Sequence, residues 1–209
     1  MRRGYFITLE GPDGVGKTTQ LALLLDAVKK LGLQAIQTRE PGGTAIGDAV
    51  REILLNPNYS GMTTITEALL YAASRAQLVQ EVIKPALLAG KVVLCDRFID
   101  SSLAYQVYAG GLDFDFVWQI NRAASADSLP DRTFVLNLDP QVGLARRGKA
   151  FADRMEQKPL SYHRRVRDGF LKIAERFPER IVVIDANQPV ERVFAEIWSH
   201  LAPVLVALR

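Results

Sequence analysis

The stretch "GPDGVGKTT", residues 11–19, places three glycines, a lysine and two threonines between an apolar run and a leucine-rich segment. Glycine lets the backbone turn sharply or approach a ligand closely, and it costs stability where neither is needed. The spacing Gly11-x-x-x-x-Gly16-Lys17-Thr18 matches a phosphate-binding loop, in which backbone N–H groups surround nucleotide phosphates, the lysine reaches the outer phosphates and the hydroxyl binds Mg²⁺. The residues predicted to hold a nucleoside triphosphate are Gly11, Pro12, Asp13, Gly14, Val15, Gly16, Lys17, Thr18 and Thr19.

The segments on both sides of this loop support the same interpretation. The apolar run 5–9 is typical of a buried strand, and residues 21–31 have a helical apolar face that ends at Gly32. A helix that begins directly after the loop presents N–H donors and the positive end of its dipole to a phosphate. A glycine-rich connector without a ligand is therefore the less favoured explanation.

The rest of the chain alternates strand-like and helical patterns. Thr64-Ile-Thr-Glu67 fits a capping box that opens a helix running toward Pro85. A later helix is expected to stop at Pro178, and Pro189 is expected to be the first residue of a last helix. The alternation predicts an α/β fold, a doubly wound parallel sheet flanked by helices. The predicted strands are residues 5–9, 34–37, 92–95, 133–138 and 181–184.

The composition is that of a globular protein without membrane spans. The chain has 209 residues, 48% of them hydrophobic and 23% charged, and a formal charge of +3. This length fits one domain, residues 1–209, and the mild positive charge suits an anionic partner without naming it. No stretch reaches transmembrane length. The single cysteine, Cys95, excludes an internal disulfide and, within an apolar run, is expected to be buried. These features predict a cytoplasmic location.

An acid and an arginine, Asp96 and Arg97, follow the third predicted strand. Ligands of open α/β sheets bind beyond the carboxyl ends of the strands, so both side chains are expected to face the phosphate-binding loop. Asp96 could order Mg²⁺ and its waters, and Arg97 could hold a second phosphate group by planar two-point contact. The alternative is a local ion pair that closes the strand.

Two helical faces add aromatic and polar groups. Glu67, Tyr71 and Arg75 are four residues apart and share one face, as do Ser101 and Tyr105. A tyrosine beside an arginine can stack on a base and hydrogen-bond its edge. The alternative is a packed aromatic ring with a surface charge next to it. The two histidines, at 163 and 200, lie outside every motif and are expected at the surface.

Six segments, in the same order along nearly the whole chain, together resemble the bacterial thymidylate kinase family: "EGPDGVGKTTQ", "TREPGGT", "EALLYAASRAQ", "CDRFIDSSLAYQ", "PDRTFVLNLDP" and "DRMEQ". The resemblance implies Mg²⁺-dependent transfer of a phosphoryl group from ATP to dTMP, giving ADP and dTDP. It further implies a five-stranded parallel sheet of the nucleoside monophosphate kinase type, a mobile lid and a homodimer. Neither a nucleic acid nor a membrane is an expected partner.

The resemblance also implies roles in binding dTMP. Arg97 and Arg51 would hold its phosphate, and Asp13 would face its sugar and phosphate. Tyr71, where the family usually has phenylalanine, would stack on thymine, and Arg75 would donate to a thymine carbonyl. The predicted substrate-binding residues are Asp13, Glu40, Arg51, Tyr71, Arg75, Arg97, Ser101, Tyr105 and Gln106, of which Tyr105 would crowd the 2′ position while Ser101 and Gln106 contact the base.

The lid corresponds to residues 146–156, which are rich in basic side chains. The phosphate-binding loop contains no arginine, so a lid arginine is expected to supply the missing charge at the transferring phosphoryl group. Arg154 is the first candidate, with Arg146 or Arg147 the second. Three alternatives stay open: a kinase for another nucleoside monophosphate, a regulatory nucleotide-binding switch, and a nucleic-acid-binding module that uses the basic stretch.

Overall fold

The structure, a computed structural model, describes residues 3–147 and 153–208. A five-stranded sheet has the order β2-β3-β1-β4-β5, and all of its strand pairs are parallel. The predicted α/β fold is confirmed, and each strand lies within two residues of its predicted position. Because β1 is central, the loop that follows it opens at the middle of the carboxyl edge. The strands are β1 (Phe6–Glu10), β2 (Ala35–Arg39), β3 (Val92–Asp96), β4 (Arg132–Asn137) and β5 (Ile181–Asp185).

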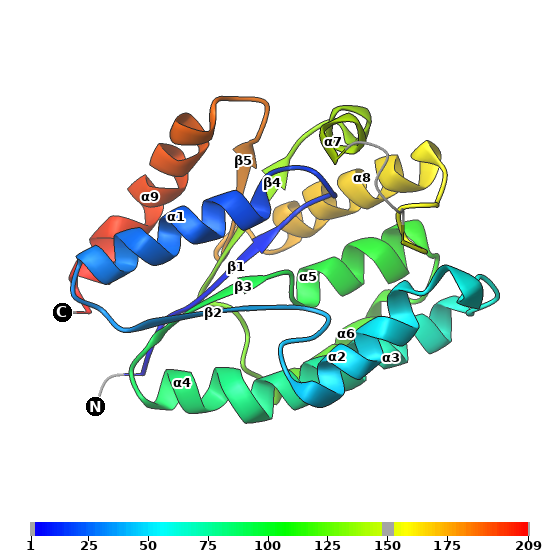
Figure 1. Cartoon of the computed structure of the whole chain (residues 1–209), viewed down its shortest axis with the longest axis horizontal. Helices are drawn as coiled ribbons and strands as arrows, with labels where there is room; N and C mark the ends of the chain where they lie inside the picture. Colours follow the sequence, from blue (N-terminus) through cyan, green and yellow to red (C-terminus); the bar gives the residue numbers. More distant parts are fainter. Residues whose placement is uncertain (1–2, 148–152, 209) are drawn as a thin grey trace.

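Helices cover both faces of the sheet (Figure 1). Helices α1 and α9 lie side by side on one face, and α3 and α4 lie on the other. The helices are α1 (Lys17–Lys30), α2 (Ala45–Leu55), α3 (Thr64–Leu78), α4 (Lys84–Leu88), α5 (Ile99–Ser102), α6 (Phe114–Ser125), α7 (Pro140–Arg147), α8 (Leu160–Arg176) and α9 (Val190–Val206). A 3₁₀ turn, Pro57–Tyr59, and two π-helical segments, Val79–Ile83 and Leu103–Ala109, complete the described elements.

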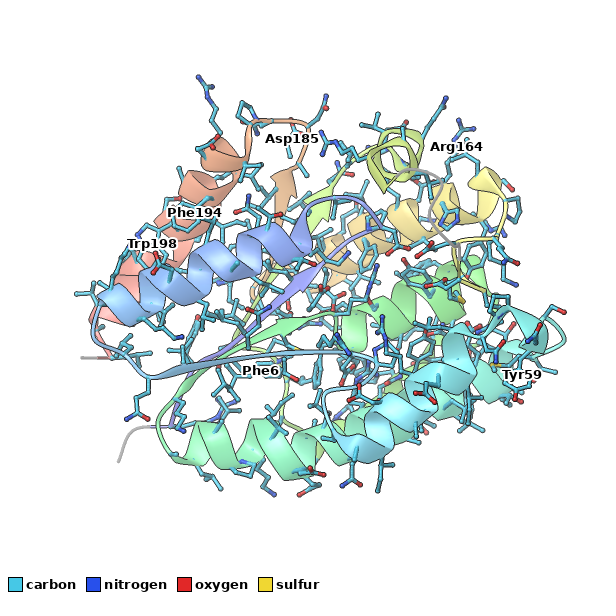
Figure 2. The ribbon with its side chains drawn as sticks, in the orientation of Figure 1. Phe6, Tyr59, Arg164, Asp185, Phe194 and Trp198 are labelled. Atoms are coloured by element: carbon cyan, nitrogen blue, oxygen red, sulfur yellow. The ribbon has the colours of Figure 1, made fainter. Side chains whose placement is uncertain are left out.

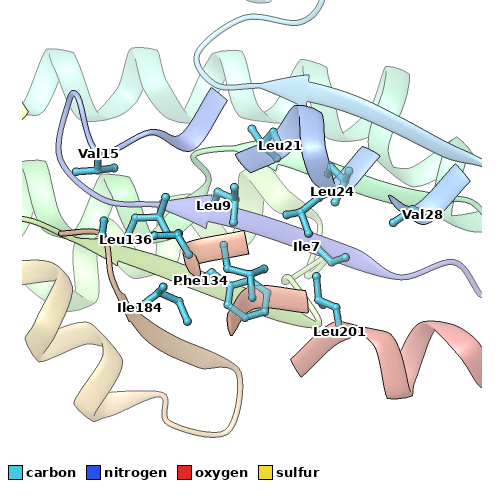
Figure 3. Close-up of a cluster of buried hydrophobic side chains, with 14 of the residues drawn as sticks. Ile7, Leu9, Val15, Leu21, Leu24, Val28, Phe134, Leu136, Ile184 and Leu201 are labelled. Carbon is cyan, nitrogen blue, oxygen red and sulfur yellow. The ribbon is translucent and has the colours of Figure 1, made fainter. Parts of the chain in front are cut away.

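The core follows from the alternation of side chains along the strands. Ile7 and Leu9 of β1 point toward α1 and α9, where they pack with Leu24 and Leu201 (Figure 3). Phe6, which precedes them in the pleat, belongs to the cluster on the other face. Both clusters are buried, so the central strand is fixed on both sides. The end of β1, from which the loop departs, is thereby held rigidly.

Helix α9 carries two stacked aromatic rings, Phe194 and Trp198, with centroids 6.0 Å apart, and both rings are partly buried against the core (Figure 2). No helix among the described residues is long and apolar enough to cross a membrane. Cys95 is buried in β3, as expected.

Two predicted helix starts are wrong by one residue. Thr63, not Thr64, caps α3, because its hydroxyl accepts from the backbone N–H of Thr66 at 3.3 Å. Glu67 is consequently no part of a capping box and is buried. Pro189 is the residue before α9 rather than its first residue.

The predicted end of helix α8 is confirmed, whereas the predicted surface position of one histidine is wrong. Helix α8 ends at Arg176, shortly before Pro178. His163, expected at the surface, is buried on α8 with its ring against Tyr162.

Candidate active site

The phosphate-binding loop connects β1 to α1 and depends on its glycines. Gly14 has φ +74°, and a Cβ added to it would lie 2.0 Å from the carbonyl oxygen of Gly143 in α7. Gly16 has φ +94° and directly precedes α1. No described side chain caps this helix start, and its first turn contains no acid. The N–H groups and the positive dipole end of α1 are therefore available to an anion.

Lys17 lies across this loop. Its Nζ donates to the carbonyl oxygens of Pro12 at 2.9 Å and Gly11 at 3.2 Å. Burial, with a smaller contribution from the charge of Arg97, lowers the pKa of Lys17 to about 8. A phosphate beside the ammonium group would favour its charged form. The lysine is thus held over the loop before any ligand arrives.

Arg97 joins the end of β3 to the phosphate-binding loop. Its Nη2 donates to Asp13 Oδ1 at 2.7 Å, and its Nη1 donates to the Gly11 carbonyl at 3.0 Å and to Ser101 Oγ at 3.1 Å. The backbone of Arg97 is left-handed, with φ +67°, a conformation that costs free energy for a residue with a Cβ. The guanidinium pairs with the loop acid and not with the neighbouring Asp96, which disfavours the strand-closing ion pair.

Glu10 supports the turn that carries Arg97. Its two carboxyl oxygens accept from the backbone N–H of Phe98 at 2.7 Å and from Ser101 Oγ at 2.6 Å. Burial, and next the charge of Asp100, raise the pKa of Glu10 to about 7. This buried acid connects the end of β1 to the segment after β3.

Asp96 and Thr18 provide a small set of oxygen atoms. Asp96 Oδ1 is buried without a hydrogen-bond partner among the described residues, and Thr18 is exposed at the start of α1. The described residues contain no group of three or more His, Cys, Asp or Glu that would hold a metal alone. Mg²⁺ commonly takes only one or two protein oxygens and completes its shell with water and phosphate. The Asp96 and Thr18 oxygens fit that ion.

A cavity of about 480 Å³ extends from the phosphate-binding loop across the carboxyl edge of the sheet. Most of the predicted site residues line it: Asp13, Gly14, Val15, Gly16, Lys17, Thr18, Thr19, Glu40, Arg51, Tyr71, Arg75, Asp96, Arg97, Ser101, Tyr105, Gln106 and Arg146. Gly11, Pro12 and Arg154 do not belong to its lining. Arg147 ends α7. Residues 148–152 of the predicted lid, including Lys149, lie outside the described residues.

Arg75 is buried at one end of the cavity, with 1% of its surface exposed. Its Nε and Nη2 donate to Glu40 Oε2, and its Nη1 donates to Ser102 Oγ at 2.9 Å and to Asn121 Oδ1. Its guanidinium carbon lies 5.0 Å from the centroid of the Phe98 ring. A guanidinium has five N–H donors, so one N–H of Nη2 is left without a partner among the described residues.

Glu40 is the acid that neutralises Arg75. Burial raises the pKa of Glu40 to about 7 against the opposing charge of Arg75. Its second oxygen, Oε1, is buried and has no hydrogen-bond partner among the described residues. The Glu40–Arg75 ion pair is therefore buried, and removing either residue would leave an unpaired charge in the interior.

A third buried acid, Glu67 of α3, lies behind the cavity wall. Its Oε1 accepts from Gln106 Nε2 at 2.8 Å, and its Oε2 accepts from Arg154 Nη2 at 2.5 Å. Arg154 also donates from Nε to the Leu54 carbonyl at 2.8 Å. Hence the predicted lid arginine is buried and bound to protein acceptors, while exposed Arg146 lines the cavity.

Two tyrosines complete the wall. The ring centroid of Tyr105 lies 5.2 Å from the guanidinium carbon of Arg97, and its hydroxyl is buried without a partner among the described residues. Burial, and next the nearby Glu67, raise the pKa of Tyr71, which keeps its phenol neutral. Arg51, on α2, donates to the Pro41 carbonyl at 2.9 Å.

Several lining residues were not predicted. Arg39, at the end of β2, is the most informative, since it belongs to the quoted segment "TREPGGT" and ends a strand at the carboxyl edge. That position alone was a sufficient signal. Asp153, Met155 and Glu156 belong to the predicted lid, although no role was assigned to them individually. The remaining lining residues are brought to the cavity by packing: Pro41, Leu55 and Ser102.

Comparison with known proteins agrees with this geometry. The family model described as thymidylate kinase matches residues 9–197. The chain belongs to the thymidylate kinase family. The matched region contains every residue that lines the cavity.

Individual relatives support the assignment over nearly full length. The chain is 50% identical to a thymidylate kinase of Geobacillus sp. (strain WCH70) over 196 residues, covering 92% of this chain and 93% of the relative. It is 50% identical to that of Exiguobacterium sibiricum over 203 residues, covering 97% and 96%. The crystal structure of thymidylate kinase from Ehrlichia chaffeensis superposes with a TM-score of 0.79 at 34% identity, covering 95% of this chain and 99% of that one.

Proposed function

We propose that this chain is an ATP:dTMP phosphotransferase that uses Mg²⁺ and produces dTDP and ADP. One observation carries the proposal: a single cavity contains both the phosphate-binding loop and a buried pocket with unsatisfied groups that can pair with a base. Arg97 lies between these two ends and binds the loop through Asp13. Donor phosphates and an acceptor phosphate can therefore meet at Arg97.

The reaction requires positively charged groups that neutralise the phosphates, and it requires no side chain that removes a proton. A nucleoside monophosphate attacks through a phosphate oxygen that is already ionised at neutral pH, so catalysis consists of positioning and charge neutralisation. Lys17, Arg97 and Arg51 supply cations to the lining of one cavity. Lys17 would hold the outer phosphates of ATP, while Arg97 and Arg51 would hold the phosphate of dTMP. Arg51 donates to the Pro41 carbonyl from Nη1, and its other N–H groups would bind the phosphate.

Mg²⁺ would be held by Thr18 and Asp96, and when bound it would neutralise charge on the nucleotide phosphates. The remaining residues of the phosphate-binding loop would surround ATP through their backbone N–H groups. Arg146 is the better-placed lid cation, because it lines the cavity whereas Arg154 is bound to Glu67 and Leu54. We therefore place Arg146 before Arg154 as the arginine that approaches the transferring phosphoryl group.

The acceptor end would bind the deoxynucleoside. Tyr71 would stack on thymine, and the remaining N–H of Arg75 would donate to a thymine carbonyl. Tyr105, packed beneath Arg97, would close the space at the 2′ carbon of the sugar. Gln106 would contact the base and Glu40 would keep Arg75 in place. Of the other predicted groups, Asp13 would orient Arg97, and Ser101 would contact the base.

We further propose that the chain is a homodimer. Four large apolar side chains are exposed on α2 and α3, which pack against each other: Ile46, Ile53, Ile65 and Leu69. Exposed apolar side chains on two adjacent helices suit contact with a second copy of the chain. Light scattering of the purified protein would measure a dimer mass if this is right. A single domain, a lid over 146–156 and a cytoplasmic location stay predictions.

An ADP-release assay across acceptors tests the function. We expect rapid turnover with dTMP, slower turnover with dUMP, dGMP and dAMP, and little ADP without an acceptor. A larger kcat/KM for another monophosphate would identify a different nucleoside monophosphate kinase. Slow hydrolysis that no acceptor accelerates would instead indicate a regulatory nucleotide switch.

A further inference from the structure

We propose that Glu67 is a positioning residue that fixes which face of the Gln106 amide meets the base. This inference rests on the proposed function, since it concerns how that same cavity recognises its acceptor. Glu67 does not line the cavity, whereas Gln106 does. The hydrogen bond from Gln106 to Glu67 is therefore a direct connection between this acid and the ligand.

The hydrogen bonds around Glu67 leave the Gln106 side chain one orientation. Glu67 is buried and forms an ion pair with Arg154, and an ionised carboxylate has only acceptors. The amide of Gln106 must therefore turn its NH₂ group toward Glu67, to which Nε2 donates at 2.8 Å. The reversed amide would bring its carbonyl oxygen against a carboxylate oxygen, which is repulsive. The orientation thus follows from the chemistry of the partner.

The other end of the amide is unsatisfied. Gln106 Oε1 is buried and has no hydrogen-bond partner among the described residues, and only 1% of the surface of Gln106 is exposed. A buried acceptor without a donor costs free energy, which a ligand N–H placed there would recover. A pyrimidine with an imino N–H, such as thymine, offers that donor at N3. Cytosine has an acceptor at N3 and would oppose Oε1 with a lone pair.

Arg154 keeps Glu67 in this role. Its guanidinium neutralises the acid and is itself fixed to the Leu54 carbonyl, while its backbone N–H donates to the Leu55 carbonyl at 3.1 Å. Because both oxygens of Glu67 are engaged by different partners, the carboxylate has little freedom to rotate. The acid therefore holds Gln106 in place before a nucleotide binds.

The Glu67→Gln variant tests the inference. The amide introduced at position 67 has one acceptor oxygen, which Arg154 takes, so its NH₂ group turns toward Gln106. The Gln106 amide must then reverse and present its own NH₂ group to the cavity. We expect the preference for binding dTMP over dCMP, measured as the ratio of dissociation constants by calorimetry, to fall by about tenfold or more.

The double variant Glu67→Gln, Gln106→Glu keeps the hydrogen bond from Arg154 to position 67. It also keeps the hydrogen bond between positions 67 and 106, but position 67 is now the donor. The carboxylate introduced at position 106 accepts from the new amide at position 67 with one oxygen and offers its other oxygen to the base. We expect the dTMP to dCMP ratio to return to within about threefold of wild type, a rescue that a merely structural role of Glu67 would not produce. This variant also provides the test if the single variant does not fold.

Asp100→Asn is the matched control. Asp100 is a buried acid paired with Arg180, and neither residue lines the cavity. It should lower the melting temperature and leave the binding ratio unchanged. A folded Glu67→Gln variant with the wild-type ratio, or a folded double variant without rescue, would overturn the inference. Turnover of dTMP by wild type is measured separately, so binding preference without turnover would refute only the proposed function.

Discussion

Replacing Arg75 by Met should lower the free energy of unfolding and should also weaken the binding of dTMP. The two losses can be measured separately. Arg75 and Glu40 form a buried ion pair, with 1% and 3% of their side-chain surfaces exposed. Without Arg75, Glu40 would keep neither of its carboxyl oxygens hydrogen-bonded, because Oε1 already lacks a partner among the described residues. Breaking such a pair from one side typically costs about 3–5 kcal/mol.

The loss of recognition is smaller and specific. The remaining N–H of Arg75 is expected to donate to a buried thymine carbonyl, and leaving that acceptor unpaired costs about 1–3 kcal/mol. This corresponds to a rise in the dTMP dissociation constant of about fivefold to 150-fold. The dissociation constant of ATP should change little, because its phosphates are proposed to bind at the phosphate-binding loop, away from Arg75.

A double variant separates the two effects. In Arg75→Met, Glu40→Met both charges are gone, and a buried pair replaced by apolar residues of similar volume is often close to neutral. Urea unfolding should therefore recover most of the lost free energy, while calorimetry with dTMP should still show weak binding. Arg180→Met is the matched control, since it breaks the buried pair with Asp100 outside the cavity.

Two results would refute this reasoning. If Arg75→Met changed the free energy of unfolding by less than about 1 kcal/mol, the pair would not be buried as described. If the double variant bound dTMP as tightly as wild type, Arg75 would not donate to the base. Arg180→Met should destabilise the protein without weakening dTMP binding.

Three further predictions concern Glu10, Lys17 and Tyr105. The pKa of Glu10 is about 7 when folded and lies near 4.5 when unfolded, so its contribution to stability is complete below pH 4.5 and is lost as pH rises through 7. Urea titrations should show that the free energy of unfolding falls by up to about 3 kcal/mol between pH 5 and pH 8 because of Glu10. The Glu10→Gln variant should lack this part of the decrease, and an equal decrease in the variant would contradict the assignment to Glu10. Lys17→Ala should lower kcat by at least about tenfold with an unchanged melting temperature, and a smaller decrease would contradict its role. Tyr105→Ala should narrow the preference for dTMP over its ribose counterpart, and an unchanged kcat/KM ratio would refute that assignment.

Local sequence patterns predicted the phosphate-binding loop and the strand ends well. Glycines with positive φ and a lysine at fixed spacing are dictated by the loop itself, so the pattern needs no tertiary information. Asp96 and Arg97 were placed correctly at the carboxyl edge because topology alone brings strand ends there. The partner of Arg97 was not predictable, since Asp13 is far away in sequence.

The burial and the partners of the acidic side chains could not be predicted from the sequence. Glu67 was assigned to a capping box because Thr64 precedes it by three residues, whereas the residue that caps α3 is Thr63. A one-residue difference in the helix start thus separates a cap from a buried position. Glu67 and Arg75 were correctly expected on one face of α3. Their burial, and the different networks that each one enters, depend on how α3 packs against its neighbours. The prediction that Arg154 approaches the phosphates likewise used no tertiary information. The ion pair between Arg154 and Glu67 joins residues far apart in the sequence, so the sequence alone does not reveal it.

Product analysis after a single turnover would show whether this chain transfers the γ-phosphoryl group of ATP to dTMP. Enzyme in excess is mixed with Mg²⁺, dTMP and ATP labelled in the γ-phosphoryl group, and the labelled products are separated by chromatography. We expect the label to move from ATP to dTDP, with little appearing as inorganic phosphate, because the proposed function places the acceptor phosphate at Arg97, which pairs with Asp13 of the phosphate-binding loop. Label found mainly in inorganic phosphate, or in ATP unchanged, would contradict it.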